Sequence, residues 1–295
     1  MSTFFLLTVT GFGLGALYFL IASGLSLIYG LMGVLNFAHG AFLTVGAYAT
    51  WYTESKLGGV DSTLLRFLVG AFAGLVVGAA VAALVELVLI RPLYKRHIEQ
   101  VLVTVGLGLA ITALVQAIWG NDARVVVVPE WTQHATHVFG AAIPNDRWVE
   151  IAVAAVVLAA LELFLRRTRY GLIIRAGVEN RAMVTALGID VRRAFTLVFA
   201  LGGVAAALAG VLASVYFGTV DPARGTSLLI FAFIVVVIGG LGSLTGTAVA
   251  SVVVALVQQY ANFYASSGLG DLSVVLLLGL VLLARPRGLS GSLAT

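Results

Sequence analysis

Long apolar stretches separated by shorter polar links run through the 295 residues of the chain. Nine such stretches lie at residues 4–30, 37–53, 64–90, 101–119, 148–165, 194–217, 227–238, 244–260 and 272–284. An α-helix rises about 1.5 Å per residue and the hydrocarbon core of a bilayer is about 30 Å thick, so the longer stretches can each cross it. The pattern therefore predicts an all-α polytopic membrane protein with about nine transmembrane or re-entrant helices.

Two Gly-bounded breaks interrupt the apolar pattern, NFAHG at residues 36–40 and GGLGS at residues 239–243. Each is followed by an apolar arm, and Asn36 is placed to cap the second helix. Paired broken segments in the two halves of a transporter indicate inverted repeats and a pathway between them. If the arms around the second break form a re-entrant pair, the number of crossings falls to seven. The predicted pathway residues are Asn36, Phe37, His39, Gly40, Gly239, Gly240, Gly242 and Ser243.

Small residues recur at helical spacing in the third apolar stretch, where Gly70, Gly74 and Gly78 stand four apart. Residues at this spacing lie on one face of a helix. Because glycine has no side chain, such a ridge lets another membrane helix approach closely. The spacing predicts a tight helix–helix contact along this face.

A basic polar loop at residues 166–193 is the longest interruption of its kind. Asn180 is a good helix N-cap and Gly188 a good C-terminal stop, which predicts a helix of about two turns from Arg181 to Leu187. Exposed apolar side chains on such a loop mark a contact site, and we expect Arg181 to lie at its rim. The apolar side chains expected to face solvent are those of Met183, Val184 and Leu187.

A second polar loop, at residues 120–147, contains the strand-like sequence VVVVP from Val125 to Pro129. It predicts a small hairpin or a lid outside the membrane. The two loops leave the chain as a single transmembrane domain over residues 1–295.

Composition and charge agree with a membrane location. The mean hydropathy is +1.08 and only 10% of residues are charged, which excludes a soluble domain. Most of the 17 Lys and Arg lie at residues 91–97, 166–193 and 285–287, so the pI near 9.6 sets orientation and does not indicate nucleic-acid binding. These positions predict an N-terminus outside and a C-terminus in the cytoplasm.

An enzyme active site has little support in this sequence. The phosphate-binding loop of an ATPase needs a Gly-Lys-Ser/Thr triplet, but Lys56 follows Ser55 and Lys95 follows Tyr94. The sequence also lacks cysteines and an HExxH zinc pattern. We expect no catalytic residue, metal or cofactor on this chain, and an energy source on another subunit.

An ion-coupled secondary transporter is an alternative, since such proteins place ionisable residues inside the membrane. The candidates are Glu86, Glu162 and His39. Glu86 lies five residues before Arg91 and Glu162 four before Arg166, which favours ion pairs near the interface. For His39, a hydrogen-bonded structural role and a role in a gate or a substrate contact both stay open.

Four motifs stand in order along the chain: NFAHG, the Arg91-Pro92-Leu93 loop, the sequence RAGVENRAMVTALGIDVRRAFTLVFALGGVAAALAGVL that begins at Arg175, and GGLGS. In this order and spacing they resemble the LivH-type permeases of branched-chain amino acid ABC importers, over nearly the whole chain. In this family the loop matching residues 175–193 is the coupling segment that sits in a cleft of the ATPase. Gly177 departs from the family, which more often has a larger apolar residue there.

The resemblance implies a multi-pass permease of the bacterial inner membrane, surrounded by lipid. It implies a second, LivM-type permease, two cytoplasmic ATP-binding subunits that bind ATP and Mg²⁺, and a periplasmic solute-binding protein. The expected substrate is a branched-chain or related hydrophobic amino acid, moved by alternating access. Related permeases of the same type serve urea or short amides, so these substrates stay open as alternatives.

Overall fold

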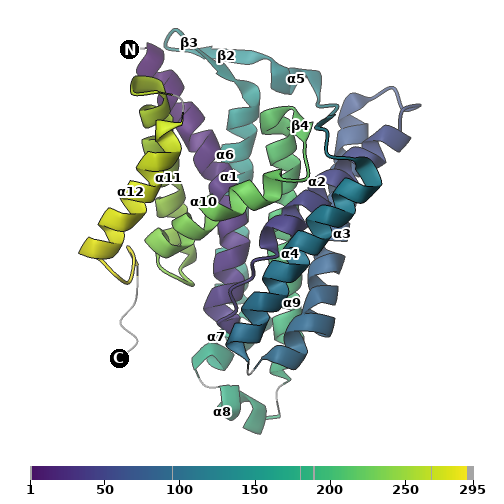
Figure 1. The fold of residues 1–295 in the computed structure, drawn as a ribbon, viewed down its shortest axis with the longest axis vertical. Coiled ribbons are helices and arrows are strands. Elements are labelled where there is room, and N and C mark those ends of the chain that lie inside the picture. Colours follow the sequence, from purple (N-terminus) through teal and green to yellow (C-terminus); the bar gives the residue numbers. More distant parts are fainter. Residues whose placement is uncertain (1, 95, 180, 189, 267, 291–295) are drawn as a thin grey trace.

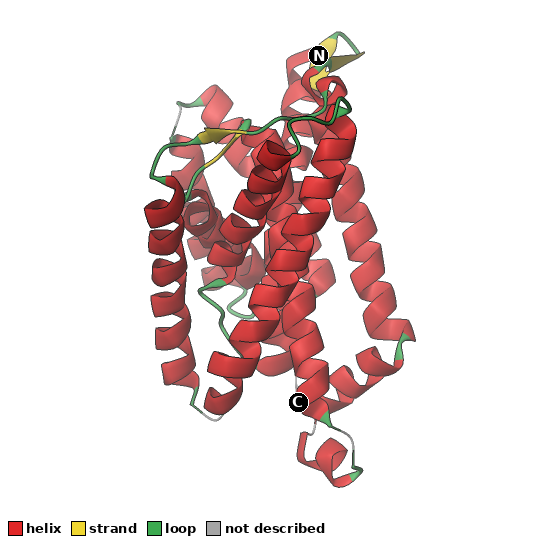
Figure 2. Cartoon of the chain, turned by 90° about the vertical axis from the view of Figure 1, so that its right-hand side faces the viewer, coloured by secondary structure: helices red, strands yellow, loops and turns green. Residues whose placement is uncertain are grey.

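The computed structural model describes residues 2–94, 96–179, 181–188, 190–266 and 268–290. Each of the nine predicted apolar stretches contains a helix, and most of these helices run along the long axis of the molecule (Figures 1 and 2). Their bounds are α1 Ser2–Met32, α2 His39–Lys56, α3 Thr63–Val85, α4 His97–Trp119, α6 Asn145–Arg167, α9 Val191–Phe217, α10 Arg224–Gly239, α11 Leu244–Tyr264 and α12 Leu269–Ala284. The all-α class is confirmed.

Six of the described helices are long and apolar enough to cross a membrane by length and composition. One of them joins α3 to a π turn, η1 (Glu86–Ile90), and a 3-10 turn, η2 (Arg91–Leu93). Two more apolar helices, α10 and α12, have 16 residues each. At 1.5 Å per residue, 16 residues span about 24 Å, short of the roughly 30 Å of a bilayer core. The link between α10 and α11 also lies well short of the end that carries α7 and α8 (Figure 1).

The helices form two inverted halves, α1–α4 and α9–α12. Helix α3 packs on α9 as α11 packs on α1, and α4 lies on α2 as α12 lies on α10. The chain runs away from the N-terminal end along α1 and toward it along α9 (Figure 1). This arrangement confirms the predicted inverted repeat. It also changes the pairing of the breaks, because the counterpart of the link at 33–38 is the link at 218–223, and that of 240–243 is 57–62.

Glycine contacts hold the two halves close together. Gly40 and Gly225, each the second residue of its helix, bring the backbones of α2 and α10 into contact. Gly24 of α1 and Gly202 of α9 meet in the same reciprocal way, so that a Cβ on Gly24 would lie 2.7 Å from the carbonyl oxygen of Gly202. In a bilayer, close backbone approach of this kind is a main source of helix association.

The predicted ridge of Gly70, Gly74 and Gly78 is confirmed as a contact face of α3. A Cβ on Gly70 would meet the carbonyl oxygen of Thr50 at 3.0 Å, and one on Gly74 would meet that of Gly46 at 2.6 Å. Gly78 lies against α9 instead. The ridge therefore packs α3 against α2 and α9 together.

The polar loop at residues 120–147 lies at the end of the molecule opposite α7 and α8 (Figure 1). The predicted hairpin exists, but it is formed by β2 (Ala135–Val138) and β3 (Ala141–Pro144) and does not include the VVVVP sequence. In that sequence only Val125 is in a strand, β1 (Arg124–Val125), which pairs with β4 (Thr219–Val220). A short helix, α5 (Glu130–Gln133), lies between the two pairings.

Candidate functional site

Two short helices fill the basic loop: α7 (Arg169–Glu179), which lies at the ends of the long helices, and α8 (Arg181–Ala186), which lies beyond them (Figure 1). The structure shortens the predicted loop to residues 168–190, since α6 continues to Arg167 and α9 begins at Val191. Thr168 begins α7, because its Oγ1 accepts a hydrogen bond of 2.9 Å from the Gly171 N–H.

Helix α8 coincides with the predicted helix and ends as predicted. Gly188 has a φ of +78°, a conformation that glycine adopts without steric cost, and stops the helix. Met183 and Leu187 are 62% and 69% exposed, as expected. The predicted cap Asn180 lies outside the described residues, and so does the side chain of Arg181.

Val184 does not face solvent, which corrects the sequence-based expectation. It is only 5% exposed and packs with Val191 and Phe195 of α9 and with Met32 at the end of α1. The reason is that α8 folds back onto α9, so one side of its short apolar patch is buried and the other is not. Val184 therefore anchors α8 to α1 and α9, and Met183 and Leu187 form its outer face.

Gly177 of α7 contributes to the same packing. A Cβ at this position would lie 3.2 Å from Cγ1 of Val191, a close contact that a larger side chain would prevent. The departure at Gly177 therefore brings α7 close to the first turn of α9.

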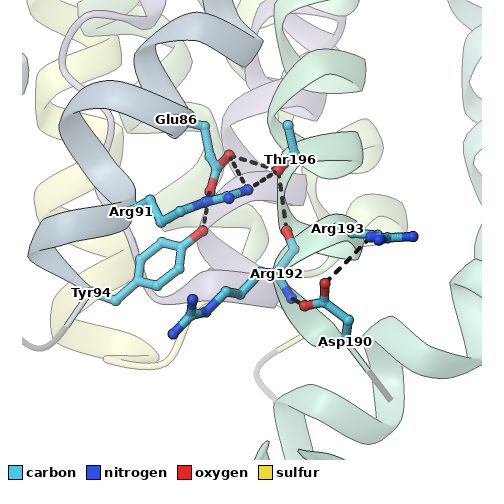
Figure 3. Close-up of polar contacts among 7 residues, drawn as sticks. All are labelled: Glu86, Arg91, Tyr94, Asp190, Arg192, Arg193 and Thr196. Carbon is cyan, nitrogen blue, oxygen red and sulfur yellow. Dashed lines mark hydrogen bonds and ion pairs between the residues drawn. The ribbon is translucent and has the colours of Figure 1, made fainter. Parts of the chain in front are cut away.

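A buried carboxylate next to this region joins α3 to α9 (Figure 3). Glu86 is fully buried and forms an ion pair of 3.3 Å with Arg91. The Thr196 hydroxyl of α9 lies 2.7 Å from both Glu86 Oε2 and Arg91 Nη2, and Tyr94 donates a short hydrogen bond to Glu86. The predicted pairing of Glu86 with Arg91 is confirmed, and Thr196 is a partner that its distance in sequence concealed.

The other candidates for ion coupling are also paired in the structure. Glu162 lies 2.7 Å from Arg166, as predicted. His39 is fully buried, and its Nε2 lies 3.1 Å from the carbonyl oxygen of Ile21. Its Nδ1 has no hydrogen-bond partner among the described protein groups. The hydrogen bond at Nε2 agrees with a structural role for His39. The second role, a gate or a substrate contact, stays open at Nδ1.

The first break lies in a non-helical segment between α1 and α2 that ends in a turn at residues 37–38. Asn36 does not cap α2, since the N-cap residue is Ala38 and has no side-chain hydrogen bond. Instead Asn36 Oδ1 accepts a bond of 3.1 Å from the Ala38 N–H, which turns the chain just before the helix. The ring of Phe37 lies 4.7 Å from that of Phe233 in α10. The segment is thus held by α10 as well as by its own neighbours.

The second break is the turn between α10 and α11. Gly240 and Gly242 have φ angles of +97° and +85°, which explains why glycine occurs here. Ser243 caps α11 by accepting a bond of 3.1 Å from the Gly246 N–H, and Gly239 touches α11 at Gly246. Helices α10 and α11 therefore form a tight pair around the turn.

The second break meets the last turn of α1. A Cβ on Gly30 would lie 2.6 Å from Cα of Gly242. Next to this contact is an open pocket of about 480 Å³. Of the predicted pathway residues, Asn36, His39, Gly40, Gly239 and Gly240 are buried and Phe37 is half-buried. Gly242 and Ser243 line the pocket together with Gly30, Val237, Leu241, Pro286, Arg287 and Ser290.

The residues after α12 close over the end of α10, which the sequence did not indicate. The Leu289 N–H donates to the Ile238 carbonyl at 2.8 Å, and the Ser290 hydroxyl donates to the Gly239 carbonyl at 2.6 Å. These bonds satisfy carbonyl groups that a helix leaves unpaired at its C-terminus. The segment at 288–290 is therefore hydrogen-bonded to the residues at the start of the second break.

Six of the described helices are suited by length and composition to span a membrane, and together with the inverted halves they define a polytopic membrane protein. The family model for the branched-chain amino acid transport system permease component matches residues 7–285. The chain therefore belongs to that family.

Two relatives match this chain over almost its full length, and a third matches over a shorter part. The chain is 30% identical over 289 residues to the high-affinity branched-chain amino acid transport system permease protein LivH of Salmonella typhimurium, covering 95% of this chain and 93% of the relative. It is 30% identical over 291 residues to BraD of Pseudomonas aeruginosa, a permease protein of the same description, covering 96% and 94%. It is also 28% identical to the fructose import permease protein FruF of Bifidobacterium longum, covering 83% and 67%.

Proposed function

We propose that this chain is the permease subunit of an ABC importer that carries a branched-chain or related hydrophobic amino acid across the bacterial inner membrane. It works with a second, LivM-type permease, two cytoplasmic ATP-binding subunits that hold ATP and Mg²⁺, and a periplasmic solute-binding protein. A LivM permease of Salmonella typhimurium is itself 27% identical to this chain, which supports a pair of related permeases. ATP hydrolysis takes place on the partner subunits.

The observation that carries the proposal is the two-sided packing of α8. Its outer face offers Met183 and Leu187, and its inner face rests through Val184 on α1 and α9. A subunit that moves α8 therefore moves the ends of both helices. Helix α1 leads directly into the first break, so a displacement at α8 reaches the predicted pathway through one helix end.

The distribution of charge supports the orientation that we propose. Arginines gather at the end that carries α7 and α8, among them Arg91, Arg166, Arg167, Arg169 and Arg175. Lys and Arg are enriched in cytoplasmic loops of membrane proteins. We place this end in the cytoplasm, where ATP-binding subunits reside, and the N-terminus with the β2–β3 hairpin outside.

Transport of a different solute is the second candidate. The FruF relative is named for fructose import, so permeases with this fold act on solutes of different chemistry. Selectivity then depends mainly on the solute-binding protein. Titrating that protein with leucine, urea, short amides and fructose distinguishes these substrates.

The test of the proposed function begins with affinity purification of the tagged chain from its native membrane in mild detergent. Recovery of two ATP-binding subunits and a second permease is the expected result. The variant Leu187→Asp should lose the ATP-binding subunits, because a charge then lies in the apolar contact. Its matched control is Val125→Asp, which alters a residue that is 75% exposed at the opposite end.

Reconstitution in liposomes distinguishes the importer from a secondary transporter. The complex should take up labelled leucine only with ATP and the solute-binding protein. Uptake by the purified chain alone, driven by an ion gradient, would contradict the proposal. Normal retention of the ATP-binding subunits by a Met183→Asp, Leu187→Asp double variant would contradict the assignment of α8.

A further inference from the structure

An open groove of about 500 Å³ lies on the side of the molecule at the level of the Glu86 cluster, separate from the outer face of α8. Three elements form it: the η1–η2 segment, α7 and α9. The residues that line it are Leu87, Arg91, Tyr170, Arg193, Thr196, Leu197 and Ala200. We propose that this groove, which we call the lateral groove, binds one anionic phospholipid, with its phosphate among the arginines and an acyl chain along the apolar part.

The side chains along α9 are ordered from polar to apolar. Arg193, Thr196, Leu197 and Ala200 follow the spacing i, i+3, i+4 and i+7, which places them on one face of the helix. The polar pair lies at the start of α9 and the apolar pair lies up to two turns further along. Seven residues rise about 10 Å, more than the roughly 5–8 Å thickness of the headgroup region on one side of a bilayer, so the face reaches from headgroup to acyl chain. The face is therefore amphipathic along its length, as a lipid is.

The opposite wall repeats this order. Leu87 lies one turn before Arg91, and because α3 and η1 run toward the α7–α8 end, Leu87 is the more deeply placed of the two. Tyr170 of α7 is 49% exposed and closes the polar end, where an aromatic residue with a hydroxyl suits a membrane interface. Both walls therefore have apolar side chains at the end deeper in the membrane and hydrogen-bond donors at the end near α7 and α8.

The charge at the polar end favours an anion. Arg193 is among the residues that line the groove, and its side chain is 84% exposed and pairs through Nε with Asp190. Arg91 uses Nε and Nη2 on Glu86 and Thr196. Arg169 and Arg192 stand directly before the lining residues Tyr170 and Arg193 in the chain, so the charge around the polar end stays positive after the two pairs are counted. Basic pockets between spanning helices on the cytoplasmic side are suited to anionic headgroups.

The inference uses the cytoplasmic orientation proposed above but does not depend on ATP-driven transport. A lipid in the lateral groove would contact both sides of the Glu86 cluster and would stabilise the junction of α3 with α9. It follows that anionic lipid raises the thermal stability of the chain whether or not the chain is part of an importer.

The test measures the unfolding temperature of the purified chain in detergent as short-chain phosphatidylglycerol is added. Phosphatidylglycerol should raise it in a saturable way, whereas phosphatidylcholine and glycerol phosphate should not. Arg193→Gln should weaken the apparent affinity about tenfold, and Ala200→Phe should weaken it similarly by filling the apolar part. The unfolding temperature without lipid shows whether each variant is folded.

The matched control is Arg175→Gln, which removes an exposed arginine of α7 that does not line the groove. It should bind phosphatidylglycerol as the unmodified protein does. An equal loss in this variant would mean general electrostatic attraction and would overturn the proposal. Equal stabilisation by glycerol phosphate, or by phosphatidylcholine, would overturn it as well.

A photoreactive amino acid in place of Leu197 extends the test to the native membrane. The expected product is an adduct with phospholipid. An adduct with another protein would show that a subunit covers the groove and would refute lipid binding. Failure of the ABC importer proposal would leave both results unchanged, so the two ideas can be judged separately.

Discussion

The contact between α2 and α9 allows a quantitative test of how tightly the two halves are packed. A Cβ added to Gly46 of α2 would lie 2.5 Å from Cβ and 2.6 Å from Cα of Ala207 in α9. Carbon atoms attract best at about 3.5–4.0 Å, so Gly46→Ala requires the helices to separate by about 1 Å. The obstacles are the Cα and Cβ atoms of an alanine, and neither can move away by adopting another rotamer.

The cost of this separation follows from the surrounding contacts. Moving α2 outward also loosens its contact with Gly74 of α3. Overpacking a core of this kind costs about 1–3 kcal/mol, and alanine returns up to about 1 kcal/mol of helix propensity. A net loss of about 1–2 kcal/mol corresponds to a decrease in unfolding temperature of about 2–8 °C, at the 2–4 °C per kcal/mol seen in soluble domains of 150–250 residues.

The assay compares Gly46→Ala with Gly106→Ala in the same detergent, by thermal unfolding of the isolated chain. Gly106 lies in α4, and an added Cβ there meets nothing within 4 Å. Gly106→Ala should therefore leave the unfolding temperature unchanged or raise it slightly. Equal unfolding temperatures for the two variants would refute the reasoning, because the packing contact would then carry no energy.

Two further predictions concern the polar cluster and the last described segment. Thr196→Val should lower stability by about 1–2 kcal/mol, because the buried Glu86 loses a hydroxyl partner, and Thr196→Ser should restore it in the same thermal assay. Gly288→Ala should release the segment at 288–290, since Gly288 has a φ of +77° and its Cβ would lie 2.7 Å from the Gly240 nitrogen. Faster trypsin cleavage after Arg287 is the expected result, and an unchanged cleavage rate would count against this role.

The sequence predicts the helices well because each apolar stretch must satisfy its backbone hydrogen bonds within itself in a membrane. The ridge at Gly70, Gly74 and Gly78 is likewise visible, since its spacing is that of one helix face. The sequence does not show which side of a short surface helix faces the rest of the protein. Val184 directly follows the exposed Met183 and stands three residues before the exposed Leu187, and only the position of α9 decides that Val184 is buried.

Contacts between distant residues escape sequence reasoning for the same reason. Thr196 and Glu86 are 110 residues apart, and Ser290 and Gly239 are 51 apart. In both pairs, the sequence around one residue does not indicate which distant residue it contacts. The cap at Thr168 is different, because a threonine three residues before Gly171, just after the last arginine of α6, is a local signal for a helix start.

The inverted halves explain why the chain has one extra long helix between them. The four helices of the first half return the chain to the end where it began, since α1 runs away from that end and α4 runs back (Figure 1). The second half must start at the opposite end, because α9 runs in the direction opposite to α1. One further passage is therefore required, and α6 provides it. The residues that follow α6 necessarily emerge where α9 begins, and this places α7 and α8 against the ends of α1 and α9.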